Sequence, residues 1–172
     1  MFDSCVLGVD PGVAHMGLAV VARSNRRAQI VWAATVDTPA GVDESVRLGR
    51  VAEAVRGAIA EHHPDSVALE RVAWNVNKRS AMGVARATGA VMVAAAEAGV
   101  PVEEYGSLEV KNAITGMGNA DKDQVRRALE RVHGLKDVPA QPDAADAVAV
   151  AMTHLVRSRV TRAAARAEAS AR

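Results

Sequence analysis

Two aspartates stand at the front of an apolar segment near the end of the chain. In "PDAADAVAVAMTHLV" (142–156), Asp143 and Asp146 are three residues apart, and most of the residues that follow them are apolar. This pattern predicts a buried helix with both carboxylates on one face of its first turns. Asp143 could be the N-cap after Pro142, with Asp146 closing a capping box. The two carboxylates could instead hold a metal ion, so the segment alone leaves both interpretations open.

Two further acidic residues stand at the ends of apolar runs in other parts of the chain. Asp10 ends "CVLGVD" (5–10), and Glu70 ends the apolar part of "SVALERV" (66–72). Nearly continuous apolar runs predict central strands, where a carboxylate is costly unless it is paired or binds a cation. Asp10 also fits a turn, because a Pro-Gly pair follows it, whereas Glu70 has no such explanation.

Together the four carboxylates favour a hard-cation site. Asp10, Glu70, Asp143 and Asp146 supply oxygen donors with no matching His or Cys cluster, a set that suits Mg²⁺, with Mn²⁺ able to substitute. Two such ions about 4 Å apart activate a water and stabilise the leaving oxygen in phosphodiester hydrolysis. We therefore expect these four residues to be both catalytic and metal-binding, with two Mg²⁺ ions per active site.

Periodicity predicts the elements that must bring the acids together. Apolar or alternating runs predict strands, the first three in an antiparallel meander, over 5–10, 17–23, 28–36, 66–72 and 101–105. Helical spacing predicts helices over 43–63, 80–99, 107–114, 121–133 and from 142 onward. This order indicates an α/β fold with a mixed sheet, an antiparallel meander plus parallel strands, flanked by helices on both faces.

Composition is that of one globular domain: 172 residues, 49% hydrophobic and 24% charged. The N-terminus does not resemble a signal peptide, and the longest apolar stretch is too short for a bilayer. A single cysteine fits a reducing compartment. We therefore expect a cytoplasmic protein without membrane contact. The net charge of +1 hides a basic end, because residues 157–172 hold five arginines and one glutamate. We expect a nuclease domain over 1–156 and a flexible basic tail over 157–172.

Four blocks in order resemble the RuvC family of Holliday junction resolvases: "LGVDPG" (7–12), "ALERV" (68–72), "EVKNAITGMGNADKDQV" (109–125) and "PDAADAVAVAMTH" (142–154). The resemblance covers about residues 5–155. It implies a ribonuclease-H-like fold and a homodimer that cuts two opposed strands of four-way junction DNA alongside a RuvA–RuvB branch-migration complex. By position, it implies that the four acids are the metal-binding catalytic carboxylates.

The resemblance also implies that Lys111 and Lys122 lie near the DNA backbone. From the residues alone, a lysine at the start of a helix is unfavourable, and a bound phosphate would reverse that effect. The preceding "TGMGN" (115–119) could expose backbone N–H groups to the same anion, or it could be a plain turn. Lys111 could equally be a solvated surface lysine.

The second block departs from the family pattern. The family commonly has an aromatic residue directly after E-x-V, whereas this chain has Ala73 there, followed by Trp74. We hypothesise that Trp74 stacks on an unpaired base in its place; the alternative is a Trp that folds back onto the core. Arg71, Lys78 and Arg79 surround it with basic groups suited to DNA backbone contacts.

The segment 80–99 and His154 can each be interpreted as structural or as functional. The segment 80–99 is small and apolar on most sides, which fits a core helix of the monomer, and the resemblance favours a dimer interface. His154 lies roughly on the helical face of Asp146, but within an apolar segment, so we expect a core histidine with satisfied hydrogen bonds.

The predicted function is a structure-selective endonuclease that resolves Holliday junctions in DNA recombination and repair by Mg²⁺-dependent phosphodiester hydrolysis. Two alternatives stay open. One is a related ribonuclease-H-like nuclease acting on other branched DNA or on RNA. The other is a non-catalytic junction-binding module whose acids are structural.

Overall fold

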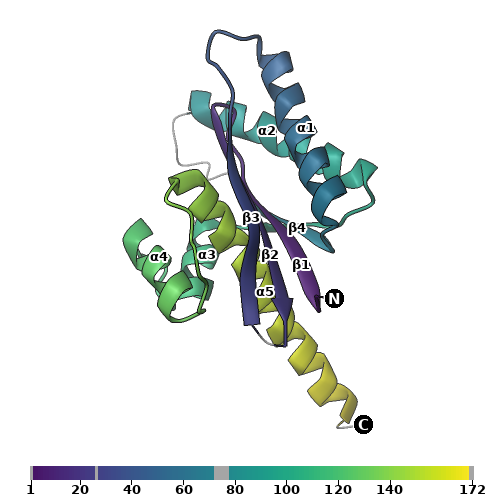
Figure 1. Ribbon diagram of the computed structural model, residues 1–172, viewed down its shortest axis with the longest axis vertical. Helices are drawn as coiled ribbons and strands as arrows, with labels where there is room; N and C mark the ends of the chain where they lie inside the picture. The colour runs from purple at the N-terminus through teal and green to yellow at the C-terminus, as the bar shows by residue number, and fades with distance from the viewer. Residues whose placement is uncertain (1, 26, 72–77, 171–172) are drawn as a thin grey trace.

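The computed structural model describes residues 2–25, 27–71 and 78–170, and within the last range the side chains of residues 81–158. The described chain forms strands and helices in the predicted order (Figure 1). The strands are β1 (Ser4–Asp10), β2 (His15–Ser24), β3 (Arg27–Asp37), β4 (Ser66–Glu70) and β5 (Val102–Tyr105). The helices are α1 (Glu44–His62), α2 (Lys78–Glu97), α3 (Ser107–Thr115), α4 (Lys122–Arg131) and α5 (Pro142–Ser170). Every predicted element is present, with ends shifted by a few residues.

The strands form a single sheet in the order β3-β2-β1-β4-β5. β1, β2 and β3 pair antiparallel, whereas β4 is parallel to β1 and β5 is parallel to β4. The predicted mixed sheet with an N-terminal meander is therefore confirmed. Because β1 and β4 are parallel neighbours in the middle of the sheet, their carboxyl-terminal residues, Asp10 and Glu70, lie at the same edge.

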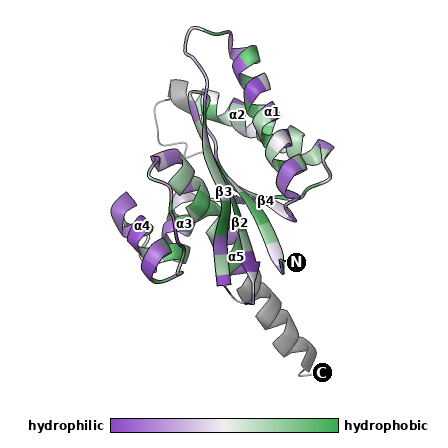
Figure 2. Cartoon of the chain, viewed as in Figure 1, coloured by the Kyte–Doolittle hydropathy of each residue, from purple (hydrophilic) through white to green (hydrophobic). Residues whose placement is uncertain are grey.

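The two faces of the central strands carry side chains of different size. Large apolar side chains such as Leu7, Leu18 and Leu69 face α1 and α2. Smaller residues such as Ala19 and Ala68 face α5. Figure 2 shows the hydrophobic colour on the strands, whereas α4 is mainly hydrophilic. The sheet is thus covered by helices on both faces, as expected, and the leucines of the central strands face α1 and α2.

Two glycines allow α5 to lie directly on the sheet. A Cβ atom on Gly8 would overlap the backbone oxygen of Ala147, and a Cβ atom on Gly17 would overlap the backbone oxygen of Asp143. Gly17 is also the register partner of Asp10 across β1 and β2. The first turns of α5 therefore lie against the end of β1, where Asp10 is located.

Helix α5 extends past the predicted domain boundary. It is continuous from Pro142 to Ser170, through residue 156 and into the segment with the arginines. Figure 1 shows this end of the helix projecting beyond the sheet. The division at residue 156 and the flexibility of residues 157–172 stay predictions. Within the described ranges, every helix is too short or too polar to span a membrane.

Candidate active site

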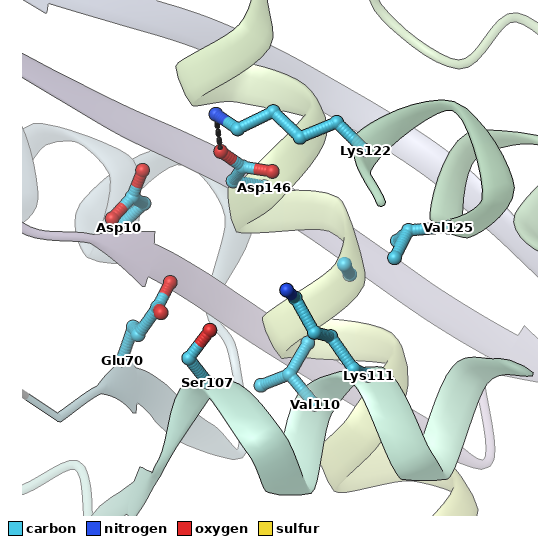
Figure 3. Close-up of a pocket in the computed structure, with 9 residues that line it drawn as sticks. Asp10, Glu70, Ser107, Val110, Lys111, Lys122, Val125 and Asp146 are labelled. Atoms are coloured by element: carbon cyan, nitrogen blue, oxygen red, sulfur yellow. Dashed lines mark hydrogen bonds and ion pairs between the residues drawn. The ribbon is translucent and has the colours of Figure 1, made fainter. Parts of the chain in front are cut away.

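Three of the predicted carboxylates line one pocket at the carboxyl ends of the central strands. Asp10 comes from β1, Glu70 from β4 and Asp146 from the second turn of α5 (Figure 3). The pocket has a volume of about 280 Å³. Side chains from α3, α4 and α5 complete its lining, and these are Ser107, Val110, Lys111, Lys122, Val125 and Ala149. The fold thus brings acids from three distant segments together with two lysines.

Burial and neighbouring negative charges destabilise the ionised forms of Asp10 and Glu70 in this pocket. Burial raises the pKa of Asp10 to about 8, and the charges of Glu70, Asp146 and Asp143 add to the effect. Burial also raises the pKa of Glu70, again with a contribution from the charge of Asp146. Lys122 partly offsets both shifts. When all three carboxylates are ionised, the pocket lining carries more negative than positive charge, and a bound cation would stabilise that ionised form.

Lys122 is paired with one of the acids. Its Nζ atom lies 2.7 Å from Oδ2 of Asp146, and this hydrogen bond raises the pKa of Lys122. Lys122 is the first residue of α4, as expected, and Asp121 caps that helix by accepting from the backbone N–H of Gln124. The positive end of the α4 dipole disfavours a lysine at this position, and the negative charge of the Asp146 carboxylate offsets that cost.

Asp143 is the exception among the four acids. It does not belong to the pocket lining, although it is close enough for its charge to raise the pKa of Asp10. The predicted N-cap role for Asp143 is wrong, because α5 begins at Pro142 and makes Asp143 its second residue. Proline suits the first helical position, since its missing N–H has no partner there. Asp146 is the fifth residue of α5, too far along for a capping box.

The donor set suits a divalent metal ion. All the acidic donors are oxygens, and their excess charge favours a hard cation such as Mg²⁺. In the described part of the chain, however, no three acidic, histidine or cysteine side chains are close enough together to hold one ion. Figure 3 shows the Asp146 carboxylate bonded to Lys122.

Comparison with known proteins decides the family. The profile described as "Crossover junction endodeoxyribonuclease RuvC" matches residues 6–154. The chain belongs to the RuvC family. The RuvC crossover junction endodeoxyribonuclease of Rhodococcus opacus is 46% identical over 167 residues, which are 96% of this chain and 88% of that protein. The one from Syntrophomonas wolfei is 38% identical over 150 residues, 87% of each chain.

Solved structures agree with this assignment. The structure of T. thermophilus RuvC in complex with Holliday junction substrate matches with a TM-score of 0.85 and 37% identity, over 92% of this chain and 96% of that one. The yeast mitochondrial Holliday junction resolvase Ydc2 shares the fold, with a TM-score of 0.64 at 12% identity over 88% of this chain and 77% of that one. The predicted RuvC family, ribonuclease-H-like fold and role as a Holliday junction resolvase in recombination and repair are confirmed. RuvC nucleases depend in general on divalent metal ions.

The other predicted DNA-binding residues have different surroundings. Lys111 lines the same pocket as Lys122. Arg71 follows Glu70 but does not line the pocket, and its Nη2 atom lies 3.7 Å from Oε2 of Glu109. Lys78 and Arg79 open α2, but their side chains lie outside the described ones, and Trp74 lies outside the described residues altogether. Their DNA contacts stay predictions.

His154 is the satisfied core histidine that the sequence predicted. Its Nδ1 atom lies 2.9 Å from the Tyr105 hydroxyl, and its Nε2 atom lies 3.2 Å from Oγ of Ser66. These bonds link α5 to β4 and β5.

Sequence reasoning missed two residues of RuvC helix α3. Ser107 lines the pocket, and the effect of its hydroxyl on the Glu70 carboxylate opposes the upward shift of the Glu70 pKa. Glu109 accepts a hydrogen bond from the backbone N–H of Gly106 at the start of α3. The sequence carried only part of the signal, because Glu109 lies three residues after Gly106, as in a capping box, but glycine has no side chain to mark the N-cap.

Proposed function

We propose that this chain cuts two opposed strands of a four-way DNA junction by Mg²⁺-dependent hydrolysis, with Asp10, Glu70, Asp143 and Asp146 as the metal-binding catalytic carboxylates. The observation that carries the proposal is one pocket in which three of these acids meet two lysines. Asp143 is included because its charge reaches Asp10.

The acidic and the basic residues of the site have different roles in the proposed reaction. Two divalent cations held by the four carboxylates would supply Lewis acidity and activate the attacking water. Lys111 and Lys122, at the pocket wall, would bind oxygens of the scissile phosphate and offset the charge that develops in the transition state. The water oxygen bonds to phosphorus, the ester bond to the sugar oxygen breaks, and that oxygen leaves as a hydroxyl. Mn²⁺ has the same preference for oxygen donors and would substitute for Mg²⁺.

We also propose that the protein acts as a homodimer formed through α2. The exposed side chains of Met82 and Val93 lie on one face of this helix together with Gly89, whereas Ala87 and Val91 face the core. An exposed apolar stripe with a glycine allows two copies of the helix to approach closely about a two-fold axis. Two sites related by such an axis suit a junction with two opposed strands to be cut. Cooperation with a RuvA–RuvB complex remains part of the proposal, without an assigned surface.

The function can be tested with a synthetic four-way junction and a linear duplex of the same sequence. Wild type and Asp146→Asn are compared for binding and cleavage, with Mg²⁺ and with EDTA. We expect metal-dependent cutting of the junction alone by wild type, and binding without cutting by the variant. Binding by wild type without any cutting would instead support a junction-binding module.

The homodimer is tested separately by light scattering during gel filtration. We expect twice the mass of the chain for wild type and a monomer for Met82→Glu combined with Val93→Glu. A monomeric wild-type protein at micromolar concentration would contradict the proposed interface.

A further inference from the structure

One carboxylate outside the pocket joins three elements that build it. Glu109 lies on α3, and its Oε2 atom accepts from the backbone N–H of Gly106 at 2.9 Å. Its Oε1 atom lies 2.5 Å from Nη1 of Arg157 on α5. Arg71, the residue after β4, approaches the same carboxylate at 3.7 Å. Glu109 therefore connects the start of α3 to α5 and to the end of the strand that carries Glu70.

The two arginines are themselves attached to β5. The backbone N–H of Arg71 donates to the carbonyl of Tyr105 at 2.8 Å. The guanidinium of Arg157 lies 5.7 Å from the centre of the Tyr105 ring, within the range of a cation–π contact. Tyr105 is 2% exposed. The side chains of Arg71 and Arg157 are 56% and 52% exposed, so Glu109 pairs with arginines at the surface. Arg71 is held through its backbone, and Arg157 through the buried ring of Tyr105.

The same helix turn presents the pocket residues on its other side. Ser107 and Lys111 are four residues apart, so they lie on one face of α3, and both line the pocket. Glu109 lies midway between them in sequence, which directs it about 160° away from that face. A contact that fixes the back of the first turn of α3 also fixes the position of Ser107 and Lys111 relative to Glu70.

We infer that Glu109 is a positioning residue for the active site: through Gly106, Arg71 and Arg157, it sets where α3 holds Ser107 and Lys111 against Glu70. The inference rests on the proposed function, because it assigns Glu109 an effect on the rate of that hydrolysis. Glu109 does not line the pocket and is not a proposed metal ligand. Its removal should slow the chemical step and leave junction binding intact.

The test measures three properties of Glu109→Gln, which keeps the shape of the side chain but removes its charge. They are the single-turnover cleavage rate with saturating protein and Mg²⁺, the junction affinity in EDTA, and the melting temperature. We expect the cleavage rate to fall by about 10-fold to 100-fold, the range seen when residues that support an active site from outside it are replaced, with unchanged junction affinity. Glu97→Gln is the matched control, because it removes a surface pair with Arg56 (2.9 Å) far along α2.

A double-mutant cycle with Arg157→Met separates positioning from a general loss of stability. If the two residues act through their contact, the double variant should be no slower than the slower single variant. Equal cleavage rates for Glu109→Gln and wild type would overturn the inference, as would equal losses in Glu109→Gln and Glu97→Gln. If Glu109→Gln fails to fold, Arg71→Met removes another contact of the Glu109 carboxylate and tests the same inference. A wild-type cleavage rate for Arg71→Met would also count against the inference. A wild-type protein that does not cut junctions would instead overturn the proposed function.

Discussion

The Lys122 ammonium lies 2.7 Å from Oδ2 of Asp146. The lysine therefore pairs with a carboxylate that the proposed metal ions would also need as a ligand. Lys122 is 72% exposed, whereas Asp146 is 28% exposed. The lysine therefore has room to turn toward a DNA phosphate, and the aspartate remains at the pocket. Metal binding and release of Lys122 are then coupled, because both cations compete for the same oxygen.

Replacing Lys122 with Gln should have opposite effects on metal binding and on cleavage. The Mg²⁺ affinity of the DNA-free protein should rise, since the competing charge is gone, while the single-turnover cleavage rate should fall by about 100-fold through lost stabilisation of the transition state. Calorimetric titration with Mg²⁺ and a junction cleavage assay measure the two effects. Lys136→Gln, in the loop after α4, is the control. Unchanged or weaker Mg²⁺ binding by Lys122→Gln would refute the competition.

Asp10→Asn should stabilise the metal-free protein and abolish cleavage. The folded-state pKa of Asp10 is raised to about 8, so its protonated form stabilises the fold, and this contribution is lost as pH rises from about 4 to 8. Asparagine lacks the charge, so at pH 8 the variant should gain several kcal/mol in the free energy of unfolding, because the pKa shift from 3.8 to about 8 corresponds to about 1.4 kcal/mol per unit.

Denaturant unfolding in EDTA at pH 5 and pH 8 measures this difference. Wild type should lose stability between the two pH values more steeply than Asp10→Asn. Asp37→Asn serves as the control, because Asp37 is an exposed acid paired with His15. A variant that is less stable than wild type at pH 8 would show that the Asp10 charge is not a source of strain.

Mg²⁺ binding should strengthen as the pH rises toward 8. A metal ion needs the ionised carboxylate, and below its pKa of about 8 Asp10 must first release a proton. The affinity should then increase by up to about tenfold per pH unit between pH 6 and 8, with proton release into the buffer. Titrations in buffers of different ionisation enthalpy measure that proton. An affinity that is constant over this range would argue against Asp10 as a ligand.

Gly17→Ala should disturb the active site through the backbone of α5. The added Cβ would overlap the carbonyl oxygen of Asp143, so α5 must move away from the sheet. We expect a loss of about 1–3 kcal/mol in the free energy of unfolding, typical of overpacking, together with slower cleavage.

Gly57→Ala is the matched substitution for this test. Gly57 lies within α1, and a Cβ there would meet nothing within 4 Å. Alanine at this helical position should raise stability by up to about 1 kcal/mol and leave cleavage unchanged. Similar unfolding energies for the two variants would mean that α5 does not depend on the glycine contact.

The sequence by itself determined the order and type of the elements. The nearly continuous apolar runs in "CVLGVD" and "SVALERV" also assigned Asp10 and Glu70 to the ends of central strands, because such strands are buried on both faces. The blocks around these acids were specific enough to indicate the RuvC family. The catalytic roles of the four carboxylates and the DNA contacts of the basic residues stay predictions.

Only the tertiary structure decided which side chains meet. Lys122 and Asp146 are separated by 24 residues, and Glu109 and Arg157 by 48. Their pairing depends on how α3, α4 and α5 pack together, which local periodicity does not encode. Helix α5 packs on Gly8 and Gly17, and Asp143 in its first turn lies outside the pocket lining. A sequence pattern fixes the face of an element on which a residue lies, whereas the distance between two elements follows from the size of the side chains packed between them.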